Sequence, residues 1–151
     1  MAQWRFCRAT DIRTLGRYDW REAMYLVLIH WKIIRSEQAV QDFLRYWSEV
    51  LTVPDRSGLV AEFLSAPMRP EETGLFYDSI ALQDTPEYYS FINIGLWEDV
   101  TSFKEQIDRP YRMCGTGKLP FEHEKRQGLL LQPIRWRLGD ACLPKHEPPG
   151  L

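Results

Sequence analysis

The fold is decided by the stretch from 91 to 100, Phe-Ile-Asn-Ile-Gly-Leu-Trp-Glu-Asp-Val, in which a strand pattern changes into a helix pattern. Read with a period of two, Phe91, Asn93, Gly95 and Trp97 share one face, and the isoleucines and the leucine between them form an apolar core face. An amide, a glycine and an indole in a row are typical of a cavity wall rather than of a packed layer. We therefore expect a functional site on the first face.

A helix is expected directly after this strand. Asp99 is placed to cap it, and Val100, Phe103 and Ile107 fall on one stripe before Pro110 ends it.

Upstream, the apolar run from 24 to 34 predicts a central strand, because both of its alternating faces are mostly apolar. Ser36 is then placed to cap another helix, which ends before Pro54. Its apolar residues recur at spacings of three and four: Val40, Phe43, Leu44, Trp47, Val50 and Leu51.

The segment from 57 to 66 fits both a helical face and a strand alternation, and we expect a short helix. The segment 73–82 is predicted to be a strand, joined through turn residues 83–87 to the strand that leads to Trp97. Together these two strands would form a hairpin.

The remaining segments are expected to be mostly irregular. Residues 109–127 form a long loop of the kind that often covers a site. The last strand is expected at 128–138, where Pro133 favours a sheet edge or a bulge. An aromatic-rich arm at 1–22 would pack onto a surface, and the tail 139–151 would be irregular.

This order predicts an α+β, ferredoxin-like βαββαβ domain over residues 23–138, with an inserted segment at 54–69. Its antiparallel sheet would carry both helices on one face. The other face is expected to carry Trp31, Trp97 or their neighbours, which would leave a broad apolar surface in water. A second copy of the chain would cover that surface, so we expect a homodimer.

Composition limits the function classes. The chain has 151 residues, 44% of them hydrophobic, which suits one well-buried domain. Nineteen basic and 21 acidic residues are scattered, so a nucleic-acid partner is not expected. No apolar run is long enough to span a membrane and the first twenty residues lack a signal-peptide core, which predicts a cytoplasmic protein without a membrane partner.

The sequence contains neither a metal-binding motif nor a complete phosphate-binding loop. The three cysteines and three histidines are widely dispersed, with no metal-ligand spacing. The sequence at 115–118, Gly-Thr-Gly-Lys, is followed by Leu119 where a phosphate loop needs a hydroxyl. We therefore expect no metal and no cofactor.

Several stretches resemble the hairpin and second helix of antibiotic biosynthesis monooxygenase (ABM) domains, which form dimeric α/β barrels. They are Gly74-Leu-Phe-Tyr77, Asp84-Thr-Pro86, Tyr89, Leu96-Trp-Glu98 and Phe103. The resemblance covers roughly residues 23 to 138 and is sharpest from 73 to 107.

The resemblance implies roles for individual residues. In family members that oxidise polycyclic aromatic substrates without metal or flavin, an Asn and a Trp matter for activity, and their spacing is matched by Asn93 and Trp97. By this resemblance the two are catalytic candidates: Asn93 would hold a substrate oxygen or a bound peroxide, and Trp97 would form an aromatic wall. Trp31, Tyr77 and Phe103 are further candidates for substrate binding.

His30 is open to two interpretations. It could be a substrate-binding base in the cavity, or a histidine satisfied within the core or an interface.

The chain also departs from the family at two positions. Phe103 stands where the first group has a Tyr, and Ile107 stands where the haem-degrading members place their iron-ligating His. Haem ligation in that manner is therefore not expected.

Two functions follow. One is a cofactor-independent monooxygenase that acts on an apolar or aromatic small molecule. The alternative is a noncatalytic dimeric α/β-barrel module for ligand binding or interaction. An enzyme should have a pocket that Asn93 faces, whereas side chains should fill that space in an interaction module.

Overall fold

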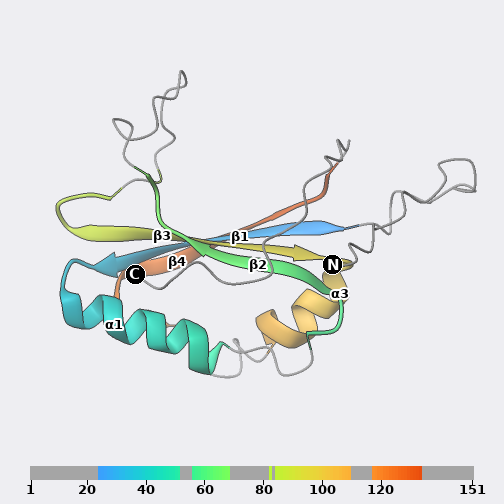
Figure 1. Cartoon of the computed structure of the whole chain (residues 1–151), viewed down its shortest axis with the longest axis horizontal. Helices are drawn as coiled ribbons and strands as arrows, with labels where there is room; N and C mark the ends of the chain where they lie inside the picture. The colour runs from blue at the N-terminus through green and yellow to red at the C-terminus, as the bar shows by residue number, and fades with distance from the viewer. Residues whose placement is uncertain (1–23, 52–55, 69–81, 83, 110–116, 134–151) are drawn as a thin grey trace, which may run out of the picture.

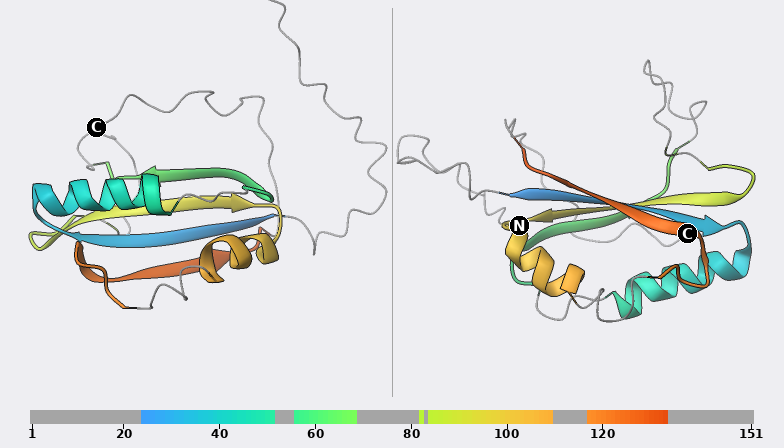
Figure 2. Two further views of the ribbon diagram at one scale, coloured as in Figure 1. Left: turned by 90° about the horizontal axis from the view of Figure 1, so that it is seen from below. Right: turned by 180° about the vertical axis from the view of Figure 1, so that it is seen from behind.

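The computed structural model describes residues 24–51, 56–68, 82, 84–109 and 117–133. These residues form an antiparallel sheet with helices on one side only (Figures 1 and 2). No helix in this part of the chain is long and apolar enough to cross a membrane.

The described elements follow the expected βαββαβ order. They are β1 (Tyr25–Ile34), α1 (Glu37–Arg45) with the π-helical turn η2 (Tyr46–Val50), β2 (Leu59–Ser65), β3 (Tyr88–Trp97), α3 (Val100–Phe103) with the π-helical turn η3 (Lys104–Asp108), and β4 (Glu122–Leu131). The strands lie in the order β2-β3-β1-β4, and every neighbouring pair is antiparallel. This is the ferredoxin-like arrangement, so the predicted fold class is confirmed.

The two helices predicted to start after Ser36 and Asp99 begin at these caps. The hydroxyl of Ser36 accepts a hydrogen bond from the backbone N–H of Ala39 at 3.2 Å. The carboxylate of Asp99 accepts from the backbone N–H and from the hydroxyl of Ser102, both at 2.7 Å. Each cap satisfies a backbone donor that the first helical turn leaves unpaired.

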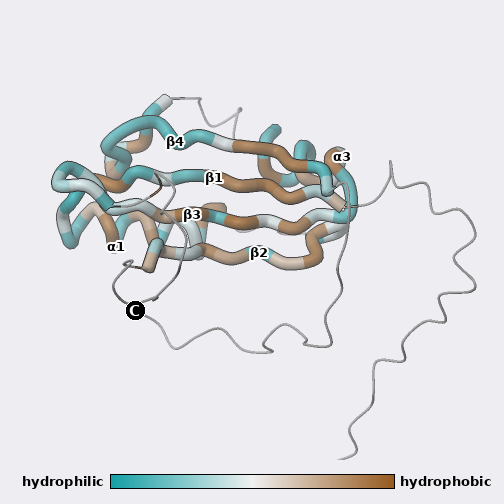
Figure 3. Tube along the Cα trace, turned by 90° about the horizontal axis from the view of Figure 1, so that it is seen from above, coloured by the Kyte–Doolittle hydropathy of each residue, from teal (hydrophilic) through white to brown (hydrophobic). Residues whose placement is uncertain are grey.

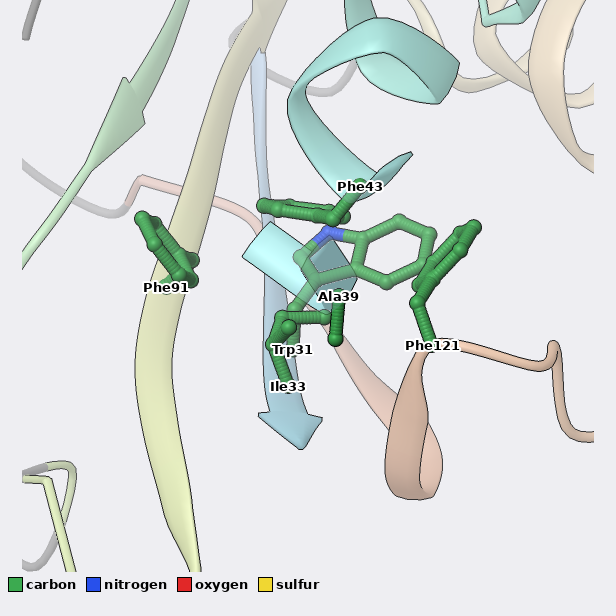
Figure 4. Packing of buried hydrophobic residues seen from close by; sticks show 6 residues of the cluster. All are labelled: Trp31, Ile33, Ala39, Phe43, Phe91 and Phe121. Carbon is green, nitrogen blue, oxygen red and sulfur yellow. The ribbon is translucent and has the colours of Figure 1, made fainter. Parts of the chain in front are cut away.

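An aromatic cluster fixes α1 on the sheet. The Phe43 ring is fully buried, and its centroid lies 5.2 Å from that of Trp31 and 5.0 Å from that of Phe91 (Figure 4). A second, smaller cluster joins Trp97 to α3 and η3. Ile29 of β1 packs against both clusters, which places the space between the two helices over the middle of the sheet.

The segment from 57 to 66 is a strand, and the predicted helix there is wrong. In β2, Glu62 pairs with Gly95 and Leu64 with Asn93 of β3. A helix at this place would leave the edge of β3 without backbone partners, and pairing as a strand satisfies them. The proposed insertion is therefore the second strand of the fold, and 73–81 lies outside the described residues.

The last strand begins earlier than predicted. β4 starts at Glu122, inside the expected loop, and ends at Leu131, so Pro133 follows the strand instead of interrupting it. Its first half is charged, which hid the strand pattern but is common in strands at a sheet edge. The predicted edge position of this strand is confirmed.

The two sheet faces were partly misassigned. Trp31 and Trp97 lie on the helix-covered face, where each is only 1% exposed. The helix-free face carries their neighbours, among them Leu28 and Ile94, which are half-buried and not the packed core that we expected. Figure 3 shows this side of the sheet, with hydrophobic residues concentrated in the half of β1 and β4 that lies toward α3.

Candidate functional site

A cavity of about 300 Å³ lies between the sheet and the helical segments. This volume is at the lower end of the range for small-molecule sites. The lining is mostly apolar with a few polar groups: Val27, Ile29, Trp31, Leu51, Glu62, Asn93, Phe103, Ile107, Asp108, Arg126, Gly128, Leu129 and Leu130. The side chains come from all four strands and from the ends of both helical segments, so only the folded chain assembles this cavity.

Asn93 lies on β3 at the centre of the polar part of the wall and is only 5% exposed. Its amide oxygen accepts a hydrogen bond from the indole Nε1–H of Trp47 at 3.2 Å. Its amide nitrogen donates to Oε1 of Glu62 at 2.8 Å. The indole can only donate, so it fixes which end of the amide faces it and which end faces Glu62.

Glu62 reaches this site because β2 is a strand. Its register opposite Gly95 turns the side chain toward the helix-covered face, where it lines the cavity. Burial raises the pKa of the Glu62 carboxyl, while the hydrogen bond from Asn93 and the charge of Arg56 act in the opposite direction. The site therefore contains one carboxyl group that protonates more readily than an exposed glutamate.

Arg126 of β4 forms an ion pair with a buried carboxylate. Its guanidinium donates to both oxygens of Glu122 at 2.9 Å, and Glu122 is fully buried. Glu122 also accepts from the backbone N–H of Leu119 at 2.6 Å, and burial raises its pKa. The guanidinium lies 5.3 Å from the ring centre of Trp31, within the range of a cation–π contact.

Trp31 itself contributes a buried donor to the site. Its Nε1–H has no hydrogen-bond acceptor among the described residues, although the side chain lines the cavity. Leaving a buried donor unpaired costs roughly 1 to 3 kcal/mol.

The sequence-predicted site residues are only partly brought together. Asn93, Trp31 and Phe103 line the cavity. Trp97 is buried behind the wall, with its ring centre 5.8 Å from that of Phe103, and is not among the described lining residues. His30 lies on the opposite face of the sheet.

His30 has a structural partner there. Its Nε2 lies 2.6 Å from the hydroxyl of Ser90, and burial lowers its pKa. The geometry thus favours the second interpretation of His30, a histidine satisfied within the fold. Tyr77 lies outside the described residues.

Four polar groups of the site were missed in the sequence: Glu62, Asp108, Arg126 and the indole of Trp47. Glu62 was hidden because its segment was interpreted as a helix, and Arg126 because its segment was interpreted as a loop. The available signal was the alternation of Leu59, Ala61 and Phe63, which favours a strand and would have placed Glu62 on the opposite face from these three residues.

No group of three or more His, Cys, Asp or Glu residues that could hold a metal ion occurs in the described part of the chain. The polar groups that line the cavity are the carboxyl groups of Glu62 and Asp108, the amide of Asn93 and the guanidinium of Arg126. They are suited to bind and orient an organic molecule and to accept a proton from it.

No family model matches this chain, and no curated protein does. Solved structures with a similar backbone include a monooxygenase from the gene ActVA-Orf6 of Streptomyces coelicolor, in complex with nanaomycin D. It has 10% identity and a TM-score of 0.46, with 79% of this chain and 95% of that chain covered. The haem degrader MhuD from Mycobacterium tuberculosis has 12% identity and a TM-score of 0.42, with 76% and 99% covered.

A third is SnoaB, a cofactor-independent oxygenase from Streptomyces nogalater, at 12% identity and a TM-score of 0.40, with 74% and 95% covered. These neighbours are oxygenases and a haem degrader.

Proposed function

We propose that this chain binds an apolar, aromatic small molecule in the cavity and oxidises it with molecular oxygen, without a metal or flavin. The observation that carries the proposal is the apolar cavity with the Asn93 amide in its wall. A pocket with few convergent polar groups is the usual form of a small-molecule site.

The reaction places a demand on the substrate. With no other reductant, the substrate must supply the electrons, as when an activated CH₂ group and O₂ give a carbonyl and water. Asn93 has a second N–H besides the one that Glu62 accepts, and this N–H would hold a substrate oxygen or a peroxide. Trp31 and Phe103 would form the aromatic walls.

The noncatalytic ligand-binding module remains the second candidate. Phe103 favours it, because this side chain lines the cavity at the position where family members that oxidise aromatic substrates carry a Tyr hydroxyl. In that case the cavity would bind the same ligands without consuming oxygen.

A thermal-shift screen of polycyclic phenols and quinones tests the proposal, with wild type and Asn93→Ala in parallel. Ligands of the wild type should stabilise it, and the substitution should weaken that effect. Oxygen uptake with each ligand then separates the two candidates, since only the enzyme consumes oxygen. If no compound stabilises the wild type, binding in this cavity is refuted. If Asn93→Ala responds to every ligand as the wild type does, Asn93 has no role in the site.

We further infer that the chain is a homodimer in which the helix-free sheet face is covered by a second copy. In the described part of the chain, this face carries half-buried or exposed apolar side chains from all four strands, such as Leu28, Phe63, Ile94 and Leu131. Apolar side chains exposed together on one face are expected to be covered by a partner. Light scattering at micromolar concentration should give twice the chain mass, and a monomer mass would exclude the dimer.

A further inference from the structure

We propose that Glu62 selects the ligand of this cavity: its second carboxylate oxygen accepts a hydrogen bond from a hydroxyl group on an aromatic ring and then takes the proton. The inference rests on the proposed function, since it names the substrate class of the same site. It adds a hydroxylated aromatic compound as the ligand and Glu62 as the group that recognises it.

The first step is the fixed orientation of Asn93. The Trp47 indole donates to the amide oxygen at 3.2 Å, so the amide nitrogen must point the other way, toward Glu62. A flipped amide would place two donors against each other at Trp47 and an amide oxygen against the carboxylate. The relay from Trp47 through Asn93 therefore dictates that Glu62 presents an acceptor to Asn93.

The second step concerns the remaining oxygen of Glu62. Oε1 accepts from Asn93 at 2.8 Å, and within the described part of the chain no donor is hydrogen-bonded to Oε2. The side chain lines the cavity and is half-buried. An ionised carboxylate has only acceptor capacity, so a ligand must bring the donor. Desolvating this oxygen without a donor is unfavourable, which selects against ligands that lack a hydroxyl.

The third step is the proton transfer. The O–H bond of the ligand breaks, an O–H bond forms on Glu62, and the negative charge moves to the aromatic oxygen. The resulting phenolate is richer in electrons than the phenol, as a substrate that must itself reduce oxygen requires. Burial makes Glu62 a stronger base than an exposed glutamate.

Other charged groups face this site from each neighbouring element. Asp108 of η3 and Arg126 of β4 line the same cavity, and the charge of Arg56, just before β2, acts on Glu62. Arg126 is paired with Glu122, so Glu62 and Asp108 are the two carboxyl groups to be distinguished by experiment.

A matched ligand pair tests the preference. The hydroxyl of 1-naphthol can donate, whereas its methyl ether has the same ring system and only an acceptor. Isothermal titration calorimetry at neutral pH should show that the wild type binds naphthol roughly tenfold more tightly or better, as expected for a hydrogen bond to a charged group.

The substitution Glu62→Gln should invert this preference. The amide oxygen of the new side chain must face the N–H of Asn93, so its NH₂ group is turned to the cavity and becomes a donor. Naphthol should then lose its advantage, and naphthoquinone, which only accepts, should bind more tightly than to the wild type. Trp47→Phe should reduce the selectivity of the wild type, since the Asn93 amide is no longer held in one orientation.

Glu105→Gln is the matched control, because it makes the same change on an exposed residue of η3 and should leave the preference for naphthol intact. Equal affinities of the wild type for naphthol and its ether would overturn the role of Glu62 but leave binding of aromatic compounds standing. The role is also overturned if Asp108→Asn removes the preference while Glu62→Gln keeps it. If neither ligand binds, the inference fails together with the proposed function.

Discussion

Gly95 lies on the helix-covered face, where the packing leaves no room for a side chain. A Cβ atom at Gly95 would lie 2.8 Å from Nε1 of Trp97, an indole that is 1% exposed and packed against Phe103. The indole has little room to move, because Val27 and the first turns after β3 enclose it. The glycine in the pattern at 91–97 is thus needed for the position of Trp97.

We predict that Gly95→Ala destabilises the fold by about 1 to 3 kcal/mol, the usual cost of overpacking a buried site. Gly128→Ala is the matched control. It is also a strand glycine at the cavity, but its Cβ would meet only the Leu28 carbonyl oxygen, at 3.9 Å. Urea denaturation of both variants measures the difference, and equal midpoints would show that Trp97 adapts without cost.

The raised pKa of Glu62 predicts a pH dependence of stability. The folded state binds this proton more tightly than the unfolded state, so the contribution of Glu62 to stability falls as pH rises from the ordinary value near 4.5. Glu62→Gln, which resembles the protonated side chain, should therefore be more stable than the wild type at neutral pH. The gain should be about 1.4 kcal/mol for each unit by which the pKa is raised. At about pH 4 and below, the two proteins should converge.

The control for this prediction is Glu124, a carboxyl group whose pKa is shifted in the opposite direction. The hydrogen bond from Lys32 lowers the pKa of Glu124, so its contribution to stability is present at neutral pH and is lost on acidification. Glu124→Gln should therefore not stabilise the protein at neutral pH. Denaturation at a series of pH values checks both variants, and a gain of stability that does not depend on pH would disprove titration of Glu62 as its cause.

At the scale of elements, helices could be predicted more securely than strands. Each helix carries its own signal, an N-cap followed by an apolar stripe, and both Ser36 and Asp99 cap as expected. β2 gives no such signal alone, since it is a strand only because β3 offers an edge. The first half of β4 is charged and forms a strand for the same reason, its pairing with β1. Asn93 and the cavity face were predicted from β3 itself, whereas Glu62 could only be found once β2 was placed.

We predict that Asp99→Ala costs about 0.5 to 2 kcal/mol, the usual loss for an N-cap. The segment it caps is short and holds Phe103 and Ile107 against the cavity, so the first turn depends strongly on these two hydrogen bonds. Asp99→Asn keeps the acceptor and should lose much less. Thermal unfolding compares the two, and an equal loss in both would assign the effect to the charge rather than to the cap.

The whole molecule has two unlike faces. The helices cover one face of the sheet and leave the other without a helix (Figure 2). The covered face buries Trp31, Phe43 and Trp97 and carries the cavity, whereas many residues of the other face are apolar and half-buried or exposed. Alternate residues of β1 and β3 point to opposite faces, and both strands carry apolar residues on each side. The sequence therefore predicts that both faces of the sheet are covered by other elements or chains. Which face carries Trp31 and Trp97 could not be predicted, because it depends on where the helices pack.

Leu28→Asp should convert the inferred dimer to monomers, because Leu28 lies in the middle of the helix-free face, paired with Ile94 and Leu129. A carboxylate there would be buried without a partner in the dimer, and dissociation returns it to water. Val50→Asp is the control, since it adds the same charge at a position that is 64% exposed on η2. Light scattering should give half the wild-type mass for the first variant and the full mass for the second. Far-ultraviolet circular dichroism should stay unchanged in both, as the cores around Phe43 and Trp97 lie on the other face. A folded Leu28→Asp variant that keeps the dimer mass would place the contact between copies elsewhere on the molecule.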